Sequence, residues 1–273
     1  MESFQKTTKI SEVLKKNNFK IKKKFGQNYI LDMNLTNKIV KKSMPLCNTI
    51  IEIGPGPGGL TRAILENGGK KIYVIEKDEE SIKLLTPLLN LYPKQLEIIN
   101  DDALTFPIYN LGTFPRQVIA NLPYNISTKF LIILLKKINN FSKITLMFQK
   151  EVANRLVADP GNKSYGRLSI LTKLLTESKI LFDVSNSAFY PKPKVTSSIV
   201  EITPLKKLKH NFNFENMEKI THFTFSKRRK MLRAIFKNHG GDKMLNEIGI
   251  SPDKRPENLS LEEFCILEQK LFR

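Results

Sequence analysis

The chain of 273 residues is 41% hydrophobic, which is enough for a full core in one large domain, or in one large and one small domain. Lys and Arg number 45 against 26 Asp and Glu, and the net charge of +19 favours a polyanionic partner over a generally basic composition. No apolar run approaches the ~20 residues of a membrane span. The two cysteines and three histidines lack the spacing of metal ligands, so we expect a metal-free cytoplasmic protein with no membrane partner.

The N-terminal region predicts two helices separated by a basic arm. Thr8 is the candidate N-cap of the first helix, and the second is expected from about Met33 to Ser43. The arm between them reads KIKKKFGQNYILD. Its lysines either contact phosphates or form a solvated face.

Short β-rich runs then alternate with helical segments. The runs read TIIEI, KIYVIE, LEII, RQVIA, KITLMF and KILFDV, and the helix after the second should end near Leu91 with Pro87 interrupting it. Continuous apolar strands separated by helices are typical of a parallel sheet covered on both faces. The last run, Ser197–Pro204, has no crossover helix after it and is a candidate for insertion as an antiparallel strand.

Beyond KKLKH the pattern is helical only, through FENMEKITHFTFS, KMLRAIFKN and LEEFCILEQKLF. This change places a domain boundary near Leu205. We therefore expect an α/β domain over residues 1–205, which includes the basic arm, and a small all-helical domain over residues 206–273.

A glycine loop, IEIGPGPGGLT, joins the first of these strands to a helix. Gly54, Gly56 and Gly59 stand in G-x-G-x-x-G register, and Glu76 ends the next strand. A backbone without Cβ lets a ligand approach the helix N-terminus, and an acidic residue at the next strand end can bind ribose hydroxyls. The loop alone indicates a nucleoside-containing cofactor without saying which one, so a nicotinamide enzyme stays open at this point.

Two carboxylate positions favour S-adenosylmethionine over a dinucleotide. Glu52, two residues before Gly54, would repel a pyrophosphate but suits the cationic amino-acid end of S-adenosylmethionine. Asp101 and Asp102 follow the third strand, where a carboxylate can accept a hydrogen bond from an adenine amino group. The alternative for Asp102 is an N-cap or turn residue.

The ordered set FGQNYILD, IEIGPGPGGLT, VIEKD, NDDAL, NLPYNIS, MFQKEVANRL, YGRLS, AFYPKPKV and FSKRRKMLR resembles the KsgA-type ribosomal RNA adenine dimethyltransferases. The resemblance implies a class I methyltransferase fold, Rossmann-like, with a mostly parallel seven-stranded sheet, one antiparallel strand and a C-terminal helical domain. It also implies transfer of two methyl groups from S-adenosylmethionine to N6 of each of two adjacent adenosines near the 3′ end of small-subunit ribosomal RNA.

The same resemblance implies roles for individual residues. The residues expected to bind the cofactor are Asn28, Ile30, Gly54, Gly56, Glu76, Asp102 and Asn121. The residues expected to hold the target adenine are Asn121, Leu122, Pro123, Tyr124 and Phe189, the last as a second aromatic wall.

The stretch NLPYNIS contains no titratable carboxylate, His, Lys or Cys. The Asn121 side-chain oxygen can accept one N6 hydrogen, and the Leu122 carbonyl, held extended by Pro123, can accept the other. Tyr124 can stack on the base. Positioning of the reactants can lower the reaction barrier by ~7 to 11 kcal/mol, whereas a general base typically raises the rate by only ~10² to 10⁴. A neutral pair of acceptors is therefore adequate.

Basic residues should bind RNA around the pocket, and a solvated face is the alternative for each. The candidates are Lys22, Lys23, Lys24, Lys150, Arg155, Lys227, Arg228 and Arg229. We expect a monomer whose partners are small-subunit ribosomal RNA and the immature small subunit. The alternatives are an Erm-type large-subunit RNA methyltransferase, a nucleic-acid-binding assembly factor on the same fold and, least favoured, a nicotinamide dehydrogenase.

Overall fold

A computed structural model describes residues 10–17, 19 and 26–272. Thr8 and the lysines at positions 22–24 therefore lie outside the described residues. The chain forms two compact units: the first holds the described residues up to Lys150 together with Lys179–Pro204, and the second holds Glu151–Ser178 and Leu205 onward. The chain enters the second unit for the last time at Leu205, where the domain boundary was expected. Residues 151–178 also belong to the second unit and pack with the C-terminal helices.

A seven-stranded sheet forms the centre of the fold in the order β4-β3-β2-β5-β6-β9-β7. The five strands from β4 to β6 are parallel, and β9 pairs antiparallel with β6, which confirms the antiparallel insertion. The strands are β2 (Thr49–Ile53), β3 (Lys71–Glu76), β4 (Leu96–Asn100), β5 (Arg116–Ala120), β6 (Lys143–Gln149), β7 (Thr176–Val184) and β9 (Ser197–Pro204).

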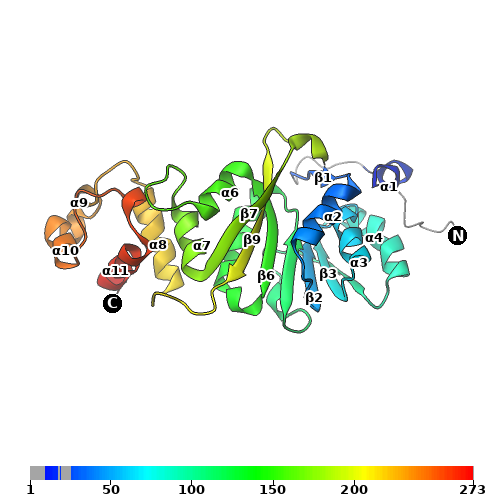
Figure 1. Ribbon diagram of the computed structural model, residues 1–273, viewed down its shortest axis with the longest axis horizontal. Helices are drawn as coiled ribbons and strands as arrows, with labels where there is room; N and C mark the ends of the chain where they lie inside the picture. Colours follow the sequence, from blue (N-terminus) through cyan, green and yellow to red (C-terminus); the bar gives the residue numbers. More distant parts are fainter. Residues whose placement is uncertain (1–9, 18, 20–25, 273) are drawn as a thin grey trace. The chain divides into compact units, whose positions relative to one another are not determined.

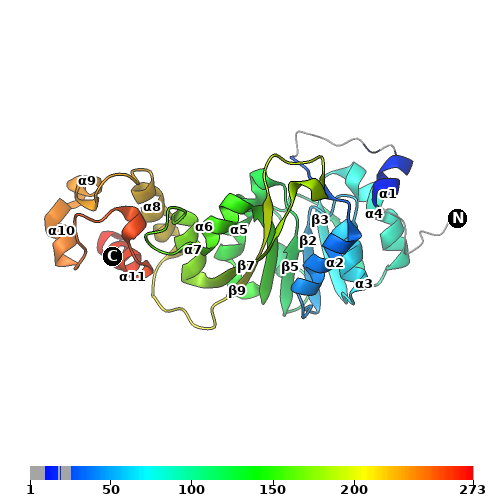
Figure 2. The same cartoon turned by 45° about the horizontal axis from the view of Figure 1, so that its top comes forward.

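Helices pack on this sheet because the inner strands carry apolar side chains on both faces; Ile50, Ile51 and Leu146, for example, have no exposed surface. Figures 1 and 2 show α2 and α3 side by side, near β2 and β3. The helices of this unit are α1 (Ile10–Lys16), α2 (Met33–Lys42), α3 (Gly59–Glu66), α4 (Glu79–Leu91) and α5 (Tyr124–Lys136), with 3-10 turns at Ile108–Asn110, Ile138–Asn140 and Asn186–Ala188.

Helix α4 continues through Pro87 as one element, so the expected interruption is wrong. Leu84, Leu85 and Leu88 are buried on this helix, and their burial offsets the one backbone hydrogen bond that a proline removes.

A two-stranded ribbon stands apart from the main sheet. Strand β1 (Tyr29–Ile30) pairs antiparallel with β8 (Phe189–Tyr190), with Tyr29 opposite Tyr190 and Ile30 opposite Phe189. The ribbon therefore joins the C-terminal part of the basic arm to the connection between β7 and β9.

The second unit is helical and has an aromatic core. Tyr165 and Phe225 meet edge to face at 6.4 Å, and Phe225 stacks on Phe264 at 6.1 Å. Its helices are α6 (Lys150–Val157), α7 (Arg167–Leu175), α8 (Phe214–Phe225), α9 (Leu232–Ile235), α10 (Gly241–Glu247) and α11 (Leu261–Phe272), with 3-10 turns at Lys237–His239 and Pro256–Asn258.

The basic segment FSKRRKMLR does not form one helix: Phe225 ends α8, a turn follows, and the short helix α9 begins at Leu232. Arg228 holds the turn, since its guanidinium donates to the Glu257 carboxylate and to the Lys163 carbonyl, at 2.6 Å each. The amide of Leu232 donates to the Lys254 carbonyl at 2.8 Å. These long-range hydrogen bonds replace the i to i−4 bonds of a helix.

Candidate functional site

The carboxyl ends of β2, β3, β4 and β5 meet at one edge of the sheet, where they surround a cavity of about 340 Å³. Polar residues at each of these strand ends line it, with residues 27–30 closing one side. An edge of this kind is where open α/β sheets bind their ligands. All of the lining residues belong to the first unit.

The glycine loop forms the floor of this site. Gly54 has φ +63° and donates its N–H to the Ile75 carbonyl at 2.9 Å, so the loop turns sharply at the end of β2. A Cβ on Gly56, at φ +53°, would lie 2.4 Å from Cε1 of Tyr29. Glycine is thus required at position 56 to let the Tyr29 ring cover the loop. Gly54 lines the cavity, whereas Gly56 does not line it and lies instead against Tyr29, which does.

Glu52 places a carboxyl group at the base of the cavity. Its side chain is 1% exposed, and Oε2 has no hydrogen-bond partner among the described residues. Burial raises the pKa of Glu52 to about 8, and the nearby Glu76 adds to the effect. A buried carboxyl group with a free oxygen that lines a cavity is suited to a cationic ligand group, because the ligand's charge would favour the ionised form that burial disfavours.

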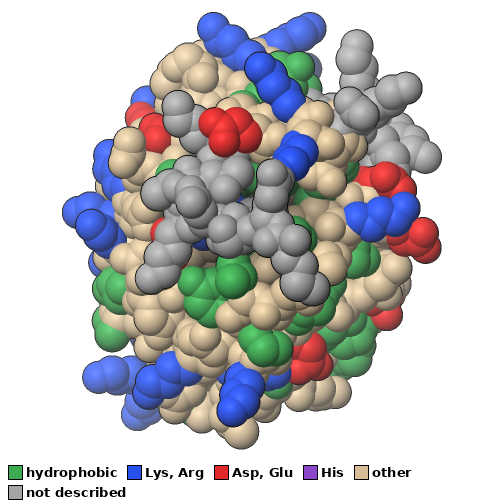
Figure 3. All heavy atoms as spheres, turned by 90° about the vertical axis from the view of Figure 1, so that its right-hand side faces the viewer, with side chains coloured by type: hydrophobic (Ala, Val, Ile, Leu, Met, Phe, Trp, Pro, Cys, Tyr) green, Lys and Arg blue, Asp and Glu red, His purple; other side chains and the backbone are tan. Residues whose placement is uncertain are grey.

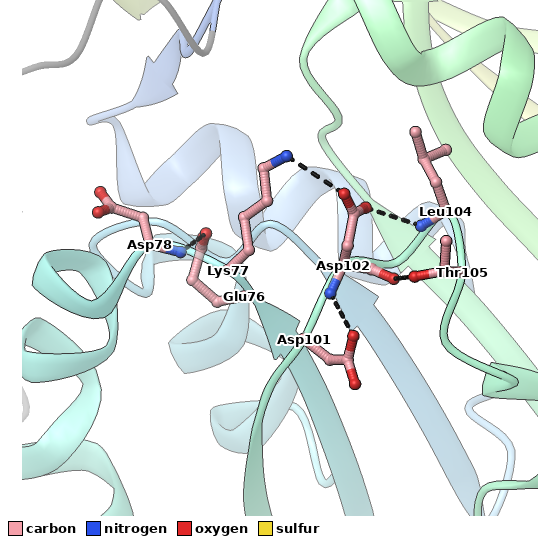
Figure 4. A network of polar contacts seen from close by, with 7 residues as sticks. All are labelled: Glu76, Lys77, Asp78, Asp101, Asp102, Leu104 and Thr105. Atoms are coloured by element: carbon pink, nitrogen blue, oxygen red, sulfur yellow. Dashed lines mark hydrogen bonds and ion pairs between the residues drawn. The ribbon is translucent and has the colours of Figure 1, made fainter.

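Glu76 lies at the end of β3, where the ribose-binding role was expected, and it lines the cavity. Its carboxylate accepts the Asp78 N–H at 2.9 Å (Figure 4), and burial raises its pKa while hydrogen bonds from backbone amides, including that of Gly56, oppose the rise. These bonds fix the carboxylate beside the glycine loop.

Asp102 also lines the cavity, at the end of β4. Its carboxylate accepts the Leu104 N–H at 3.0 Å and pairs with Lys77 at 3.3 Å (Figure 4). The backbone hydrogen bond from Leu104, helped by Lys77, lowers the pKa of Asp102, so the group stays a hydrogen-bond acceptor. Asp101 supports the turn by accepting the Asp102 N–H at 2.7 Å. The turn role weighed for Asp102 and the ligand role are therefore compatible.

Asn121 follows β5 and contacts the opposite side of the cavity. Its Nδ2 donates to the Asn28 carbonyl oxygen at 3.1 Å, and both residues line the cavity. A carbonyl oxygen only accepts, so the amide nitrogen must face Asn28 and Oδ1 must face away from it. The hydrogen bond thus fixes the amide of a cavity-lining residue and leaves its Oδ1 as an acceptor that Asn28 does not use. Ile30 lines the same wall.

The rest of NLPY continues from Asn121. No hydrogen bond from a described residue reaches the Leu122 carbonyl, and Pro123, with ψ 133°, leads directly into α5. Tyr124 is half-buried, and its hydroxyl lies 2.6 Å from Ser197 Oγ, which holds the ring between α5 and β9. Burial raises the Tyr124 pKa, and the Ser197 contact opposes the rise.

Phe189 occupies β8 and is 5% exposed. It packs in the apolar cluster that includes Ile30 and Ile199 and does not line the cavity. In this structure its ring is therefore part of the core beneath the ribbon.

The basic residues expected to bind RNA differ in their surroundings. Lys150 pairs with Asp183 at 2.6 Å, Arg155 pairs with Glu151, and Arg228 pairs with Glu257. Lys227 lies 4.4 Å from the centre of the Phe223 ring, and no described residue pairs with Arg229. On the face shown in Figure 3, which is the right-hand side of Figure 1, the Lys and Arg side chains of the described residues are scattered rather than gathered in one patch.

The sequence reasoning missed several cavity-lining residues, among them Gln27, Lys77 and Asn125. Gln27 lies in FGQNYILD and Asn125 lies in NLPYNIS, so their place in these motifs could have indicated that they line the cavity. Lys77 follows Glu76 directly, but its pairing with Asp102 depends on the spacing of β3 and β4, which no local pattern reveals.

Among the described residues, no group of three or more His, Cys, Asp or Glu side chains could hold a metal ion. Within the same residues, no helix has the length and apolar character needed to cross a membrane.

The chain is similar to known proteins over nearly its whole length. A family model described as ribosomal RNA adenine dimethylase matches residues 18–271. The ribosomal RNA small subunit methyltransferase A of Paramagnetospirillum magneticum is 41% identical over 264 residues, 96% of this chain and 94% of that protein. The protein of the same name from Rhizobium johnstonii is 43% identical over 267 residues, 96% of this chain and 97% of that protein.

Two solved structures share the fold. A dimethyladenosine transferase from Plasmodium falciparum has a TM-score of 0.70 and 28% identity, covering 86% of this chain and 94% of that chain. The 23S rRNA methyltransferase ErmE has a TM-score of 0.67 and 22% identity, covering 90% of this chain and 100% of that chain.

Glu52 predicts a pH dependence of stability. Its pKa is about 8 in the folded chain against an ordinary value of 4.5, so between these pH values the folded chain holds the extra proton. The free energy of unfolding should therefore fall as pH rises through this window, by up to about 1.4 kcal/mol per pH unit from this group. Glu52→Gln should reduce the slope, as measured by urea unfolding between pH 5 and 8.5.

The control is Glu79→Gln, because Glu79 is exposed at the start of α4 and should leave the slope unchanged. Equal slopes in Glu52→Gln and the parent protein would contradict the burial of a carboxyl group at this position.

Proposed function

Because the chain belongs to the ribosomal RNA adenine dimethylase family, we propose that it dimethylates N6 of two adjacent adenosines in the loop of the 3′-terminal hairpin of small-subunit (16S) ribosomal RNA, with S-adenosylmethionine as methyl donor. The relatives that are 41% and 43% identical carry the name of a small-subunit methyltransferase, which supports the choice of subunit. The likeness to ErmE, at 22% identity, concerns the fold alone.

The observation that carries the proposal is the oriented amide of Asn121. Adenine N6 is a poor nucleophile because its lone pair is delocalised into the ring. The amine becomes reactive when its hydrogens are held and the nitrogen pyramidalises. The Asn121–Asn28 hydrogen bond commits Nδ2 to Asn28 and leaves Oδ1 as the acceptor for such a hydrogen. The Leu122 carbonyl, which accepts no hydrogen bond from a described residue, is the second acceptor.

The residues of the cavity fit S-adenosylmethionine. The free oxygen of Glu52, at the base of the cavity, suits the ammonium group of the methionine part. Glu76 is fixed where ribose hydroxyls can donate to it, and Asp102 keeps an ionised carboxylate for the adenine amino group. The Gly54 backbone leaves room for close approach.

When bound, S-adenosylmethionine supplies an activated methyl group on sulfur. The chain's own residues then have positional roles: Asn121 and Leu122 hold the N6 hydrogens, and the anchored Tyr124 ring offers a stacking surface to the target base. Orientation of this kind contributes ~7 to 11 kcal/mol, whereas general base catalysis contributes ~10² to 10⁴ in rate. The amine becomes cationic on methylation and loses its proton readily to water, so no base is required at the site.

The wider setting follows from this assignment. We propose that the first unit binds the cofactor and that the helical tail, residues 206–273, contributes RNA contacts. Reaching N6 requires an unstacked base, which suits a loop in RNA. The substrate would be the immature small subunit in the cytoplasm, and the enzyme would act as a monomer during subunit maturation.

The direct test incubates the protein with methyl-labelled S-adenosylmethionine and immature small subunits, followed by mapping of the label. We expect label on N6 of the two adjacent adenosines near the 3′ end. Label on large-subunit RNA would favour the Erm-type activity, and no label on any RNA would exclude both.

Asn121→Ala should lower the rate of methyl transfer about 100-fold or more, because the oriented acceptor is lost. RNA affinity should remain close to that of the parent protein, as measured by filter binding. Asn121→Asp is the matched variant: it keeps an acceptor but loses the donor to Asn28, so it should also lose rate. A full rate in Asn121→Asp would show that the hydrogen bond to Asn28 does not matter.

Among the basic residues of the tail, Lys227 and Arg229 are the better candidates for phosphate contacts, because Arg228 is committed to Glu257 and Lys163. Replacing Lys227 and Arg229 with Ala should reduce the salt slope of RNA binding by roughly 0.7 per contact. Arg228→Ala should instead lower thermal stability.

The control is Lys41→Ala with Lys42→Ala, two exposed residues at the end of α2. These residues precede β2 and so lie toward the amino ends of the strands, away from the cavity. A slope equal to that of the parent in the Lys227/Arg229 variant would refute the phosphate contacts.

A further inference from the structure

Tyr190 presents an exposed aromatic ring on the short ribbon. Its side chain is 55% exposed, and no ring contact or hydrogen bond joins the side chain to any described residue. The backbone beneath it is fixed, because Tyr190 pairs with Tyr29 and the neighbouring Phe189 is buried. The ring is thus held in position by its backbone but covered by nothing among the described residues.

The segment that follows Tyr190 is fixed at both ends, beside the cavity at its start and beside Tyr124 at its end. At its start, β8 pairs with β1, whose Tyr29 lines the cavity. At its end, the Thr196 carbonyl accepts the Lys150 N–H at 2.9 Å, and Ser197 Oγ lies 2.6 Å from the Tyr124 hydroxyl. In Figures 1 and 2 the yellow-green connection between β7 and β9 lies beside β1.

Residues directly opposite each other in an antiparallel pair project from the same face. Tyr190 therefore leaves the ribbon on the face of Tyr29, whose ring lies against Gly56 of the glycine loop, while Phe189 leaves on the other face with Ile30. Tyr29 and Ile30 both line the cavity, so the ribbon borders it. An exposed ring at this place stands at the margin of the site.

The same segment is basic and stiff. Lys192 and Lys194 are exposed and form no ion pair within the described part of the chain, whereas the nearby Lys150 and Lys179 are paired with Asp183 and Glu201. No acidic residue occurs between Asp183 and Glu201. Proline at positions 191 and 193 restricts the backbone, so less entropy is lost when a ligand orders the segment.

We propose that Tyr190 stacks on an unpaired nucleotide next to the target adenosine, and that Lys192 and Lys194 contact the adjoining phosphates. Aromatic rings interleaved with unpaired cations are what single-stranded nucleic acid requires, and an apolar protein partner would not use the two charges. The inference rests on the proposed function, because it takes the RNA loop as the ligand. It adds a binding surface outside the residues that hold the target base.

The experiment uses the full chain and a synthetic RNA hairpin that carries two adjacent adenosines in its loop. Tyr190→Ala should weaken binding about 5- to 150-fold, the range for loss of one stacked base. Tyr190→Phe keeps the ring and should bind like the parent. Phe114→Ala is the control, since Phe114 is 60% exposed just before β5, at the amino ends of the strands.

Abasic hairpins, with one loop base removed at a time, identify the stacked partner. At one loop position, removal of the base should weaken RNA binding by the parent protein. The same removal should not weaken binding by Tyr190→Ala any further, because the stacking contact is already missing in that variant. Separately, Lys192→Ala with Lys194→Ala should reduce the salt slope by roughly 0.7 for each contact.

Three results would overturn the inference: affinity equal to that of the parent in Tyr190→Ala, an equal loss in Phe114→Ala, or a loss in Tyr190→Ala that is the same for every abasic hairpin. An unchanged salt slope in the lysine variant would remove the phosphate contacts. Methyl transfer by the parent protein separates the two hypotheses. If the parent methylates RNA and Tyr190→Ala binds normally, only this inference fails, and if the parent methylates no RNA, the proposed function fails.

Discussion

The hydrogen bond from Asn121 to the Asn28 carbonyl connects most of what the site needs. It joins the end of β5, in the middle of the sheet, to the segment that leads into β1. It also determines which end of the Asn121 amide faces Asn28. Because β1 pairs with β8, the same bond links the NLPY stretch to the ribbon that carries Phe189 and Tyr190. The Asn121 Nδ2 donor thus fixes the orientation of its own amide and connects it to the ribbon formed by β1 and β8.

Charge is separated within the first unit. The chain carries +19 overall, yet Glu52, Glu76 and Asp102 line one cavity. The two glutamates are buried, and burial raises the pKa of each, whereas the more exposed Asp102 has a lowered pKa because Leu104 and Lys77 stabilise its carboxylate. The three carboxyl groups inside the cavity suit a cationic ligand group, while the net positive charge of the chain suits a polyanion outside it. In the proposed function, this difference favours the sulfonium cofactor in the cavity and the RNA substrate on the surface.

The sequence predicted the features that depend on local pattern. Strands such as KIYVIE, the helix from Met33 and the antiparallel strand at Ser197–Pro204 follow from periodicity and turn residues. The features it missed depend on partners far along the chain. Arg228 holds a turn through Glu257, and residues 151–178 pack with helices that come more than thirty residues later. Whether a lysine is free or paired is likewise a tertiary property, as Lys150 and Asp183 illustrate.

A site without a titratable catalyst relies on geometry, and geometry has to be maintained by the surrounding residues. The supports in this protein are all specific contacts: Asn28 for Asn121, Ser197 for Tyr124 and the Tyr29 ring against Gly56. None of these supports changes charge to act, so they work equally well over a wide pH range. Among the described residues that line the cavity, Glu52 is the buried group whose pKa is raised to about 8, and in the proposed function it faces the cofactor. Sensitivity to pH should therefore enter through cofactor binding rather than through the step at N6.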